Sequence, residues 1–276
     1  MSDGRVAHAR QDIRCAPARE IDVSEDGRKK GIFTSDTADH PVYNHLNILQ
    51  YRFDKSIGAF NYADFGRYLE DQEQSANSLV TRQGSALSLW GKARLDLFGH
   101  PIRRPRLVFR DVIHSSNQRK VWAALAPSKT LLTNKAPYLV FSSTDLRIEA
   151  YVLGILNSGV VDWFGSLKIG LNLNFFILYS LPVPIFTGSR RQERIAQLSA
   201  RLSISRDDDF GEWVKFGEPI VLPDERDAAT SELEYLVCEE FGLVDSEKEI
   251  VFGAGNKSRV SVEELRGHQR LIGARG

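Results

Sequence analysis

The sequence predicts a mixed α/β (α+β) protein, with a β-rich centre flanked by helices and a helical C-terminal region. Two observations support this prediction. Residues 106–142 contain three short runs of β-branched and apolar residues, separated by loops of Ser, Asn, Thr, Lys and Pro. The segments that follow instead carry apolar residues at helical spacing, between capping residues and glycine.

Three strands are expected in the centre, at residues 106–114, 120–126 and 138–142, because each run is rich in residues that favour a pleated, half-buried surface. An aromatic-rich stretch, residues 43–68, precedes them and is expected to hold a strand-like segment at 50–53 and a helix at 62–76. Aromatic residues at this density favour a hydrophobic core.

Helices are expected on the C-terminal side of the centre. Asp145 can cap a helix over 146–164, in which apolar residues recur at helical spacing. The next run, 170–186, is apolar and strand-like, and its two prolines, at positions 182 and 184, force an extended exit.

Two more helices follow this run. Ser189 and Gln192 form a capping box, which predicts a helix over 190–205. A final helix is expected over 230–241, since apolar residues line one of its faces and Gly242 can end it.

The bulk composition is that of an ordinary globular protein. The 276 residues include 36 Lys and Arg and 36 Asp and Glu, and 42% are hydrophobic. The two cysteines, Cys15 and Cys238, lie too far apart to suggest a disulfide framework or a metal site. No apolar run is long enough to cross a membrane, and the first residues lack the apolar core of a signal peptide. We therefore expect a cytoplasmic protein without a membrane partner.

The balanced charge hides two segments of opposite sign. Residues 82–135 contain eleven basic and two acidic side chains, a net charge of +9. Residues 218–250 contain two basic and eleven acidic side chains, a net charge of −9. A polyanion would bind the central segment rather than the C-terminal one. The alternative is that the two segments face each other in the fold.

No motif for catalysis stands out in the sequence. The histidines lack the paired spacing of metal ligands, and the run 207–209 of three aspartates lacks the alternating ligands of a calcium loop. Neither a glycine-rich cofactor loop nor an Asn-Pro-Pro-Tyr type motif occurs. We expect no catalytic, cofactor-binding or metal-binding residue in this chain, and whether it is an enzyme stays open.

The order of several strings along the chain resembles a known family. The strings are RLVFRDVIHSSNQRKVWAALAP, NKAPYLVFS, AYVLGILNSGVVDWF and LNLNFFILYSLPVPIF. Together they are similar to the C-terminal target-recognition region of adenine-specific DNA methyltransferases in type II restriction-modification systems, including single-chain enzymes that both cut and methylate DNA. RRQERIAQLSARLS and ATSELEYLVCEEFGL resemble the helical tail of these proteins, and HPVYNHLNILQYRFD resembles, more weakly, the segment after the catalytic domain. The resemblance covers about residues 41–252.

The resemblance implies a part that recognises a DNA sequence, in a restriction-modification or phage-defence system. The catalytic domain that binds S-adenosylmethionine and flips the adenine is expected outside this chain. The expected partners are double-stranded DNA and a separate methyltransferase or nuclease subunit. The chain is then either a free-standing specificity subunit or the distal piece of an interrupted gene. The alternative is a protein-interaction module that docks such a subunit through the aromatic stretch and the acidic tail, with no DNA readout of its own.

Four segments are expected on this interpretation: a poorly ordered lead-in (1–40), the DNA target-recognition module (41–187), a helical C-terminal region (188–252) and a mobile tail (253–276). Basic side chains bind phosphates, whereas amides and guanidinium groups can read base edges. The expected phosphate contacts are Arg103, Arg104, Arg106, Arg119, Lys120, Lys129 and Lys135. The expected base-edge contacts are Asn117, Gln118 and Asn134. Arg110 and His114 lie on the polar side of a predicted strand and could face either DNA or a buried partner.

Overall fold

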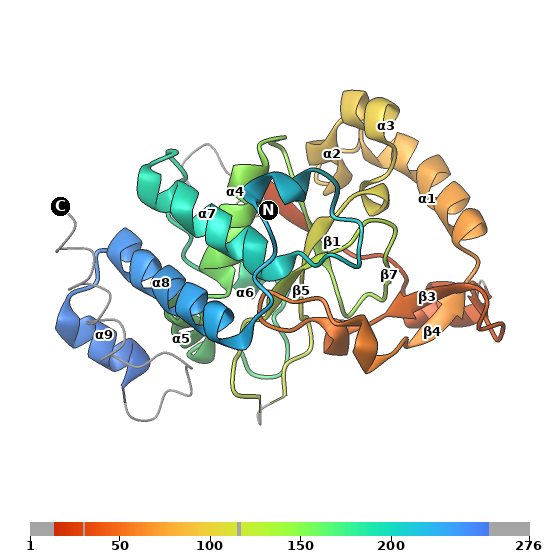
Figure 1. Cartoon of the computed structure of the whole chain (residues 1–276). Coiled ribbons are helices and arrows are strands. Elements are labelled where there is room, and N and C mark those ends of the chain that lie inside the picture. Colours follow the sequence, from red (N-terminus) through yellow and green to blue (C-terminus); the bar gives the residue numbers. More distant parts are fainter. Residues whose placement is uncertain (1–13, 30, 115–116, 254–276) are drawn as a thin grey trace.

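The mixed α/β fold is confirmed by the computed structural model, which describes residues 14–29, 31–114 and 117–253 (Figure 1). It contains two four-stranded sheets, of which the second extends to one edge of the molecule (Figure 1). The first sheet is antiparallel with the order β1-β8-β5-β6, from β1 (Cys15–Ala18), β8 (Tyr138–Phe141), β5 (Arg106–Phe109) and β6 (Ala123–Ala126). The second has the order β2-β4-β3-β7, from β2 (Phe33–Thr34), β4 (Asn61–Ala63), β3 (His40–Tyr43) and β7 (Leu131–Leu132).

Both faces of the first sheet are covered, so β5, β6 and β8 are buried along their whole length. Leu107 and Phe109 point toward the main helical core. Val108 and Tyr138 point the other way, toward a smaller core that includes Tyr43 from β3. A strand that is buried on both faces has apolar residues at successive positions. This is why apolar and polar residues do not alternate clearly in this part of the sequence.

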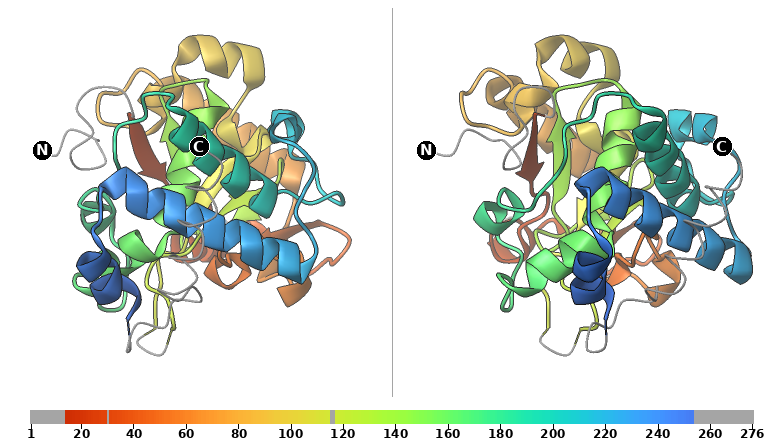
Figure 2. Two further views of the ribbon diagram at one scale, coloured as in Figure 1. Left: turned by 60° about the vertical axis from the view of Figure 1, so that its left-hand side comes forward. Right: turned by 90° about the vertical axis from the view of Figure 1, so that its left-hand side faces the viewer.

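Helices cover one face of this sheet and one of its ends. The covering helices are α4 (Leu146–Leu156), α5 (Gly159–Ser166), α6 (Phe175–Leu178), α7 (Arg190–Ser203), α8 (Pro223–Phe241) and α9 (Asp245–Phe252) (Figures 1 and 2). A second group, α1 (Phe65–Leu79), α2 (Leu87–Trp90) and α3 (Lys92–Phe98), lies apart from them (Figure 1). Short turns of 3-10 or π helix occur at Val23–Lys29, His45–Asn47, Lys55–Ile57, Pro101–Arg103 and Gly211–Phe216. In the described part of the chain, no helix combines the length and the apolar character needed to cross a membrane.

The predicted helix caps are confirmed. The Asp145 side chain accepts a hydrogen bond of 3.0 Å from the backbone N–H of Arg147 at the start of α4. Ser189 and Gln192 form the expected capping box at the start of α7. Gly242 ends α8 in the left-handed conformation, with φ of 68°. These signals are local, and local geometry is what a sequence specifies most directly.

Several predicted boundaries were wrong. The helix expected over 146–164 is two helices, because α4 ends at Leu156 and α5 starts at Gly159. The run 170–186 forms no strand and contains the short helix α6. The last expected helix begins earlier, at Pro223, whose fixed φ and missing N–H suit the first helical turn. It is followed by α9, which no pattern predicted.

The expected lead-in is only partly correct, because β1 lies within it. Cys15 is fully buried, and β1 forms the outer edge of the first sheet against β8. Pro17 fits there because an edge strand has one side without ladder hydrogen bonds. A strand of four residues, CAPA, is too short and too poor in β-branched side chains to be recognised by pattern. Residues 1–13 and nearly all of the expected tail, 254–276, lie outside the described residues.

Candidate nucleic-acid interface

Two loops meet at one end of the first sheet, residues 110–122 between β5 and β6 and residues 133–137 before β8. Backbone hydrogen bonds join them, from Asp111 N–H to Lys135 O at 3.2 Å and from Phe109 N–H to Pro137 O at 3.0 Å. The first loop extends from the body at the lower edge of Figure 1. We call the polar side chains that these loops expose, in full or in part, the loop face. Its residues are His114, Asn117, Gln118, Lys120 and Lys135, of which Asn117 and Lys120 are half-buried and the others are exposed.

Asn157 anchors the end of the first loop. Its buried amide accepts a hydrogen bond from Ala123 N–H at 3.1 Å and donates one to Ala123 O at 2.9 Å. Its backbone carbonyl in turn accepts from the Arg119 guanidinium at 2.6 Å. Asn157 belongs to the Leu-Asn-Ser string, which lies at the break between α4 and α5. This break therefore positions the residue that holds the loop.

Asp162 in α5 fixes the next turn of the same loop. One of its oxygens accepts hydrogen bonds from the N–H groups of Lys120 at 2.6 Å and Val121 at 2.9 Å. At the start of α5 both oxygens of the buried Glu234 accept from Gly159 N–H, at 2.9 and 2.8 Å. Burial raises the pKa of Glu234 to about 7, although Arg119 and the Gly159 hydrogen bond act in the opposite direction. The loop is thus held by buried polar groups rather than by surface contacts.

Three arginines expected at DNA are buried instead, with exposures of 3% for Arg106, 8% for Arg110 and 7% for Arg119. Arg106 pairs with Glu20 and donates to Thr130 O at 2.6 Å. Arg110 donates to Ile48 O at 2.6 Å and lies 4.4 Å from the centre of the Trp122 ring, and burial lowers its pKa to about 10. The side chains of these three arginines form their contacts inside the protein. The prediction that they contact DNA was therefore wrong.

The second loop has its own buried support. Asp111, which is 3% exposed, lies 3.1 Å from the Arg19 guanidinium and 4.0 Å from the Lys135 ammonium group. Asn134 donates a hydrogen bond of 2.8 Å to Asp22 and its amide oxygen is buried, which leaves it little access to a base edge. Arg19 belongs to the segment expected to be a lead-in, so its role here was missed.

The remaining predicted residues lie at the other end of β5. Arg103 donates to Glu73 at 2.7 Å, and the backbone N–H of Lys129 donates to Ile102 O at 2.9 Å. Arg104 lies beside them, with its guanidinium 4.5 Å from the centre of the Phe98 ring. The residues predicted to contact DNA therefore lie near the two ends of β5. Five of them belong to the loop face.

A cavity of about 420 Å³ adjoins the loop face at Gln118. Its wall includes Gln50 and Arg52 from the aromatic-rich stretch, Trp122 from the loop, and Arg226 from α8. Gln50 donates to Asn157 O at 3.0 Å, which connects this wall to the loop anchor. None of Gln50, Arg52 and Arg226 was predicted as a contact. Gln50 and Arg52 lie in the aromatic-rich stretch and Arg226 lies in the acidic segment, and neither segment has the basic charge that indicated DNA contact.

Two side chains of the acidic C-terminal segment lie beside arginines that are outside the basic centre. Glu232 pairs with Arg194 at 2.6 Å and Glu240 lies 3.8 Å from Arg191, both arginines belonging to α7. The charge of Arg119, from the basic segment, also acts on the buried Glu234 of the acidic segment, whose pKa it lowers against the effect of burial. The two segments therefore meet at this point, and the alternative that they face each other stays open.

The loop face can supply cations, amide groups and the His114 imidazole to a ligand. Among the described residues, no three His, Cys, Asp or Glu side chains are placed to hold a metal ion. No protein-family model matches the chain, and no curated protein sequence matches it. Any assignment of function therefore depends on the geometry of the loops and on the resemblance of the strings.

Proposed function

We propose that this chain is the DNA sequence-recognition part of an adenine-specific DNA methyltransferase, in a restriction-modification or phage-defence system of the cytoplasm. The observation that carries the proposal is the loop face, where two joined loops present polar and basic side chains and the first loop is anchored by the buried Asn157. The ordered strings shared with the target-recognition region support the same function.

The side chains of the loop face suit the two parts of DNA recognition. Lys120 and Lys135 supply cations for phosphates, and phosphate contacts set the orientation of a protein on the duplex. Asn117 and Gln118 supply amides, which can form paired hydrogen bonds with adenine. Asn157 and Asp162 hold residues 119–123, the part of the loop that follows these amides.

Catalysis is assigned to a separate domain or subunit. That part would bind S-adenosylmethionine and hold the extruded adenine. This chain would contribute the choice of sequence, and its complex with the catalytic part would be the active species.

Titration of the purified chain with random-sequence duplex DNA at several salt concentrations tests the proposal. Each phosphate contact contributes about −0.9 to the slope of log affinity against log salt. The double variant K120A/K135A should bind more weakly and with a slope shallower by up to about 2. The matched control is R67A/R190A, which removes two exposed charges from α1 and α7 and should keep the parent slope.

Two outcomes would contradict the proposal. One is equal binding by K120A/K135A and the control variant. The other is a folded chain that binds no duplex at low salt but co-purifies with a methyltransferase or nuclease subunit, which would favour the protein-interaction alternative.

A further inference from the structure

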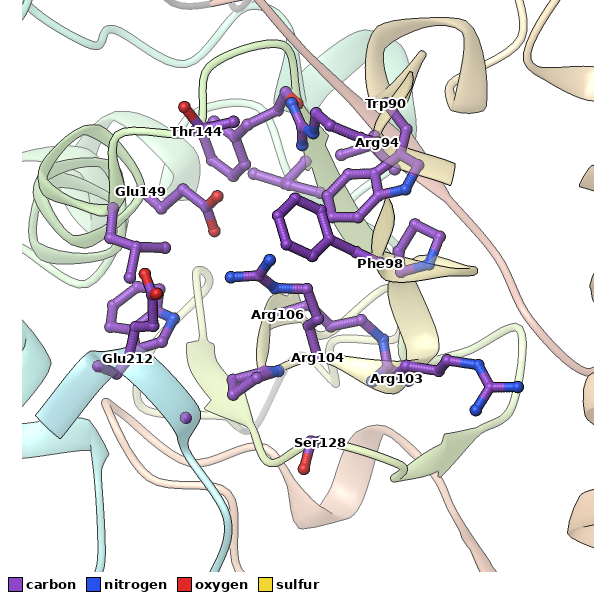
Figure 3. A pocket seen from close by; sticks show the side chains of 18 of the residues that line it. Trp90, Arg94, Phe98, Arg103, Arg104, Arg106, Ser128, Thr144, Glu149 and Glu212 are labelled. Carbon is purple, nitrogen blue, oxygen red and sulfur yellow. The ribbon is translucent and has the colours of Figure 1, made fainter. Parts of the chain in front are cut away.

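A cavity of about 350 Å³ opens at the other end of β5, away from the loop face (Figure 3). It forms where two neighbouring strands diverge. The ladder between β5 and β8 contains the single pair Val108–Tyr138, whereas four pairs join β1 to β8 and β5 to β6. Beyond this pair, residues 139–141 of β8 and residues 105–106 form opposite walls of the cavity.

Two side chains of opposite charge line this cavity without meeting. Glu149 comes from α4 and Arg104 from the segment before β5. The positive charge of Arg104 acts to lower the pKa of Glu149, but burial has the larger effect and raises that pKa to about 7. Within the described residues, neither side chain has a hydrogen bond or an ion pair within 4.0 Å. A group placed between them could bond to both.

Aromatic rings and a second arginine shape the rest of the cavity. The Arg94 guanidinium lies 3.9 Å from the centre of the Trp90 ring and donates to Phe141 O at 2.9 Å, so its position is fixed. Phe98 supports Arg104 in the same manner. Figure 3 shows Glu149 and Glu212 on one side of the cavity, opposite Trp90, Arg94 and Phe98.

A third arginine adds to the polar lining. Arg106 contributes to the wall, and its buried Nε and Nη1 atoms have no hydrogen-bond partner in the described structure. Buried donors without partners are uncommon in proteins and cost free energy. The guanidinium itself is held by Glu20 and by Thr130 O, so the site described below depends on Glu149 and Arg104 rather than on Arg106.

These groups restrict the chemistry of a ligand. Above its pKa of about 7, the ionised Glu149 only accepts hydrogen bonds and so requires a donor, and the nearby Arg94 and Arg104 disfavour a cation. Arg104 requires an acceptor, because a guanidinium group only donates. The aromatic side chains favour a flat, apolar body. A neutral ring that carries an amino group beside a ring nitrogen or carbonyl oxygen meets all three requirements, and cavities of about 300 Å³ or more hold ligands of this size.

We propose that this cavity binds an amino-bearing nucleobase, with its exocyclic amino group on Glu149 and its neighbouring acceptor on Arg104. The base could belong to a free nucleotide, or it could be a base extruded from DNA other than the adenine that the catalytic part would hold. The site does not depend on the proposed DNA contacts of the loop face, because it uses different residues at the opposite end of β5.

Fluorescence titration of the full chain tests the free-nucleotide source, since Trp90 and Trp213 line the cavity. Adenosine and cytidine monophosphates should quench the emission at pH 8. Uridine monophosphate, which lacks the amino group, should bind about ten-fold more weakly, and ribose 5-phosphate should not bind. A duplex with 2-aminopurine at single positions tests the other source, since the emission of this base rises when it leaves the stack.

Two variants test the residues. E149Q preserves the shape of the side chain, and both it and R104A should weaken binding at least about ten-fold. The control is E193Q, the same change at an exposed position of α7, and circular dichroism verifies that each variant is folded. Loss of either signal in E149Q and R104A, with E193Q unchanged, supports the site and identifies its source. Binding that is equal for all four phosphates, or unchanged in both variants, or absent in both assays, overturns it.

Discussion

Glu149 makes the stability of the protein depend on pH in a direction opposite to that of most carboxyl groups. Its pKa is raised from 4.5 to about 7 by burial. Between these values the folded chain binds more protons than the unfolded chain, so the free energy of unfolding falls as pH rises through this window. E149Q has no charge to bury at this position.

We therefore expect the stability of E149Q relative to the parent chain to increase from pH 5 to pH 8. Urea unfolding at the two pH values measures this difference. The exposed control E193Q should show a smaller change, and an equal change in the two variants would contradict the pKa assigned to Glu149.

Asn157 is the second residue whose removal should have a large effect. Asn157→Ala deletes the hydrogen bonds to both backbone groups of Ala123 and leaves them buried. Such losses cost roughly 1–3 kcal/mol for each unsatisfied group, so the free energy of unfolding should fall by about 3 kcal/mol. The matched change Asn77→Ala removes an exposed hydrogen bond to Glu73 O and should cost less than about 0.5 kcal/mol.

At the scale of elements, the contact between α5 and α9 depends on the absence of a side chain at Gly159. A Cβ atom at this position would lie 2.4 Å from Cε1 of Phe252. Alanine favours a helix by about 1 kcal/mol over glycine, but overpacking costs about 1–3 kcal/mol. Gly159→Ala should therefore destabilise the protein although it improves helix propensity.

A double-mutant cycle with Phe252→Ala separates these contributions. If the ring is the obstacle, the double variant should lose less stability than the sum of the two single variants. Thermal unfolding of the four chains measures the coupling, and strict additivity would exclude the clash as the cause.

How well the sequence predicted each element depended on how local its signals are. The caps at Asp145, Ser189 and Gly242 involve neighbours along the chain and were predicted. The break at Asn157 depends on a hydrogen bond to β6, and the burial of β1 depends on β8. Contacts between distant segments leave no periodic pattern for a single sequence to show.

The same distinction applies to the candidate site. His114, Gln118 and Lys135 were predicted from polar loop composition and are exposed. Arg106 was predicted from its charge and lies on β5, whose two faces are covered, whereas Arg110, predicted to face either DNA or a buried partner, follows β5 and is buried. Charge identifies a basic segment, but only the packing of both faces shows which arginines point inward.

At the scale of the whole molecule, β5 connects two sites with different residues. The loop face lies beyond its C-terminal end, and the Glu149 cavity lies at its N-terminal end. We expect K120A/K135A to leave nucleotide affinity within about two-fold and E149Q to leave the salt slope of DNA binding unchanged, because distant sites with no shared partners usually act independently. Reciprocal titrations of both variants measure this, and a shift of both properties in one variant would indicate coupling.

The pairing of β1 with β8 also has a consequence for how the chain is made. During synthesis, the segment Cys15–Ala18 leaves the ribosome well before its partner Tyr138–Phe141 exists. At about 5–20 residues per second this delay lasts on the order of ten seconds, far longer than local helices need to form. Throughout this delay the backbone of β1 has no partner in the sheet, so this first-made strand can pair with a neighbouring nascent chain until β8 emerges.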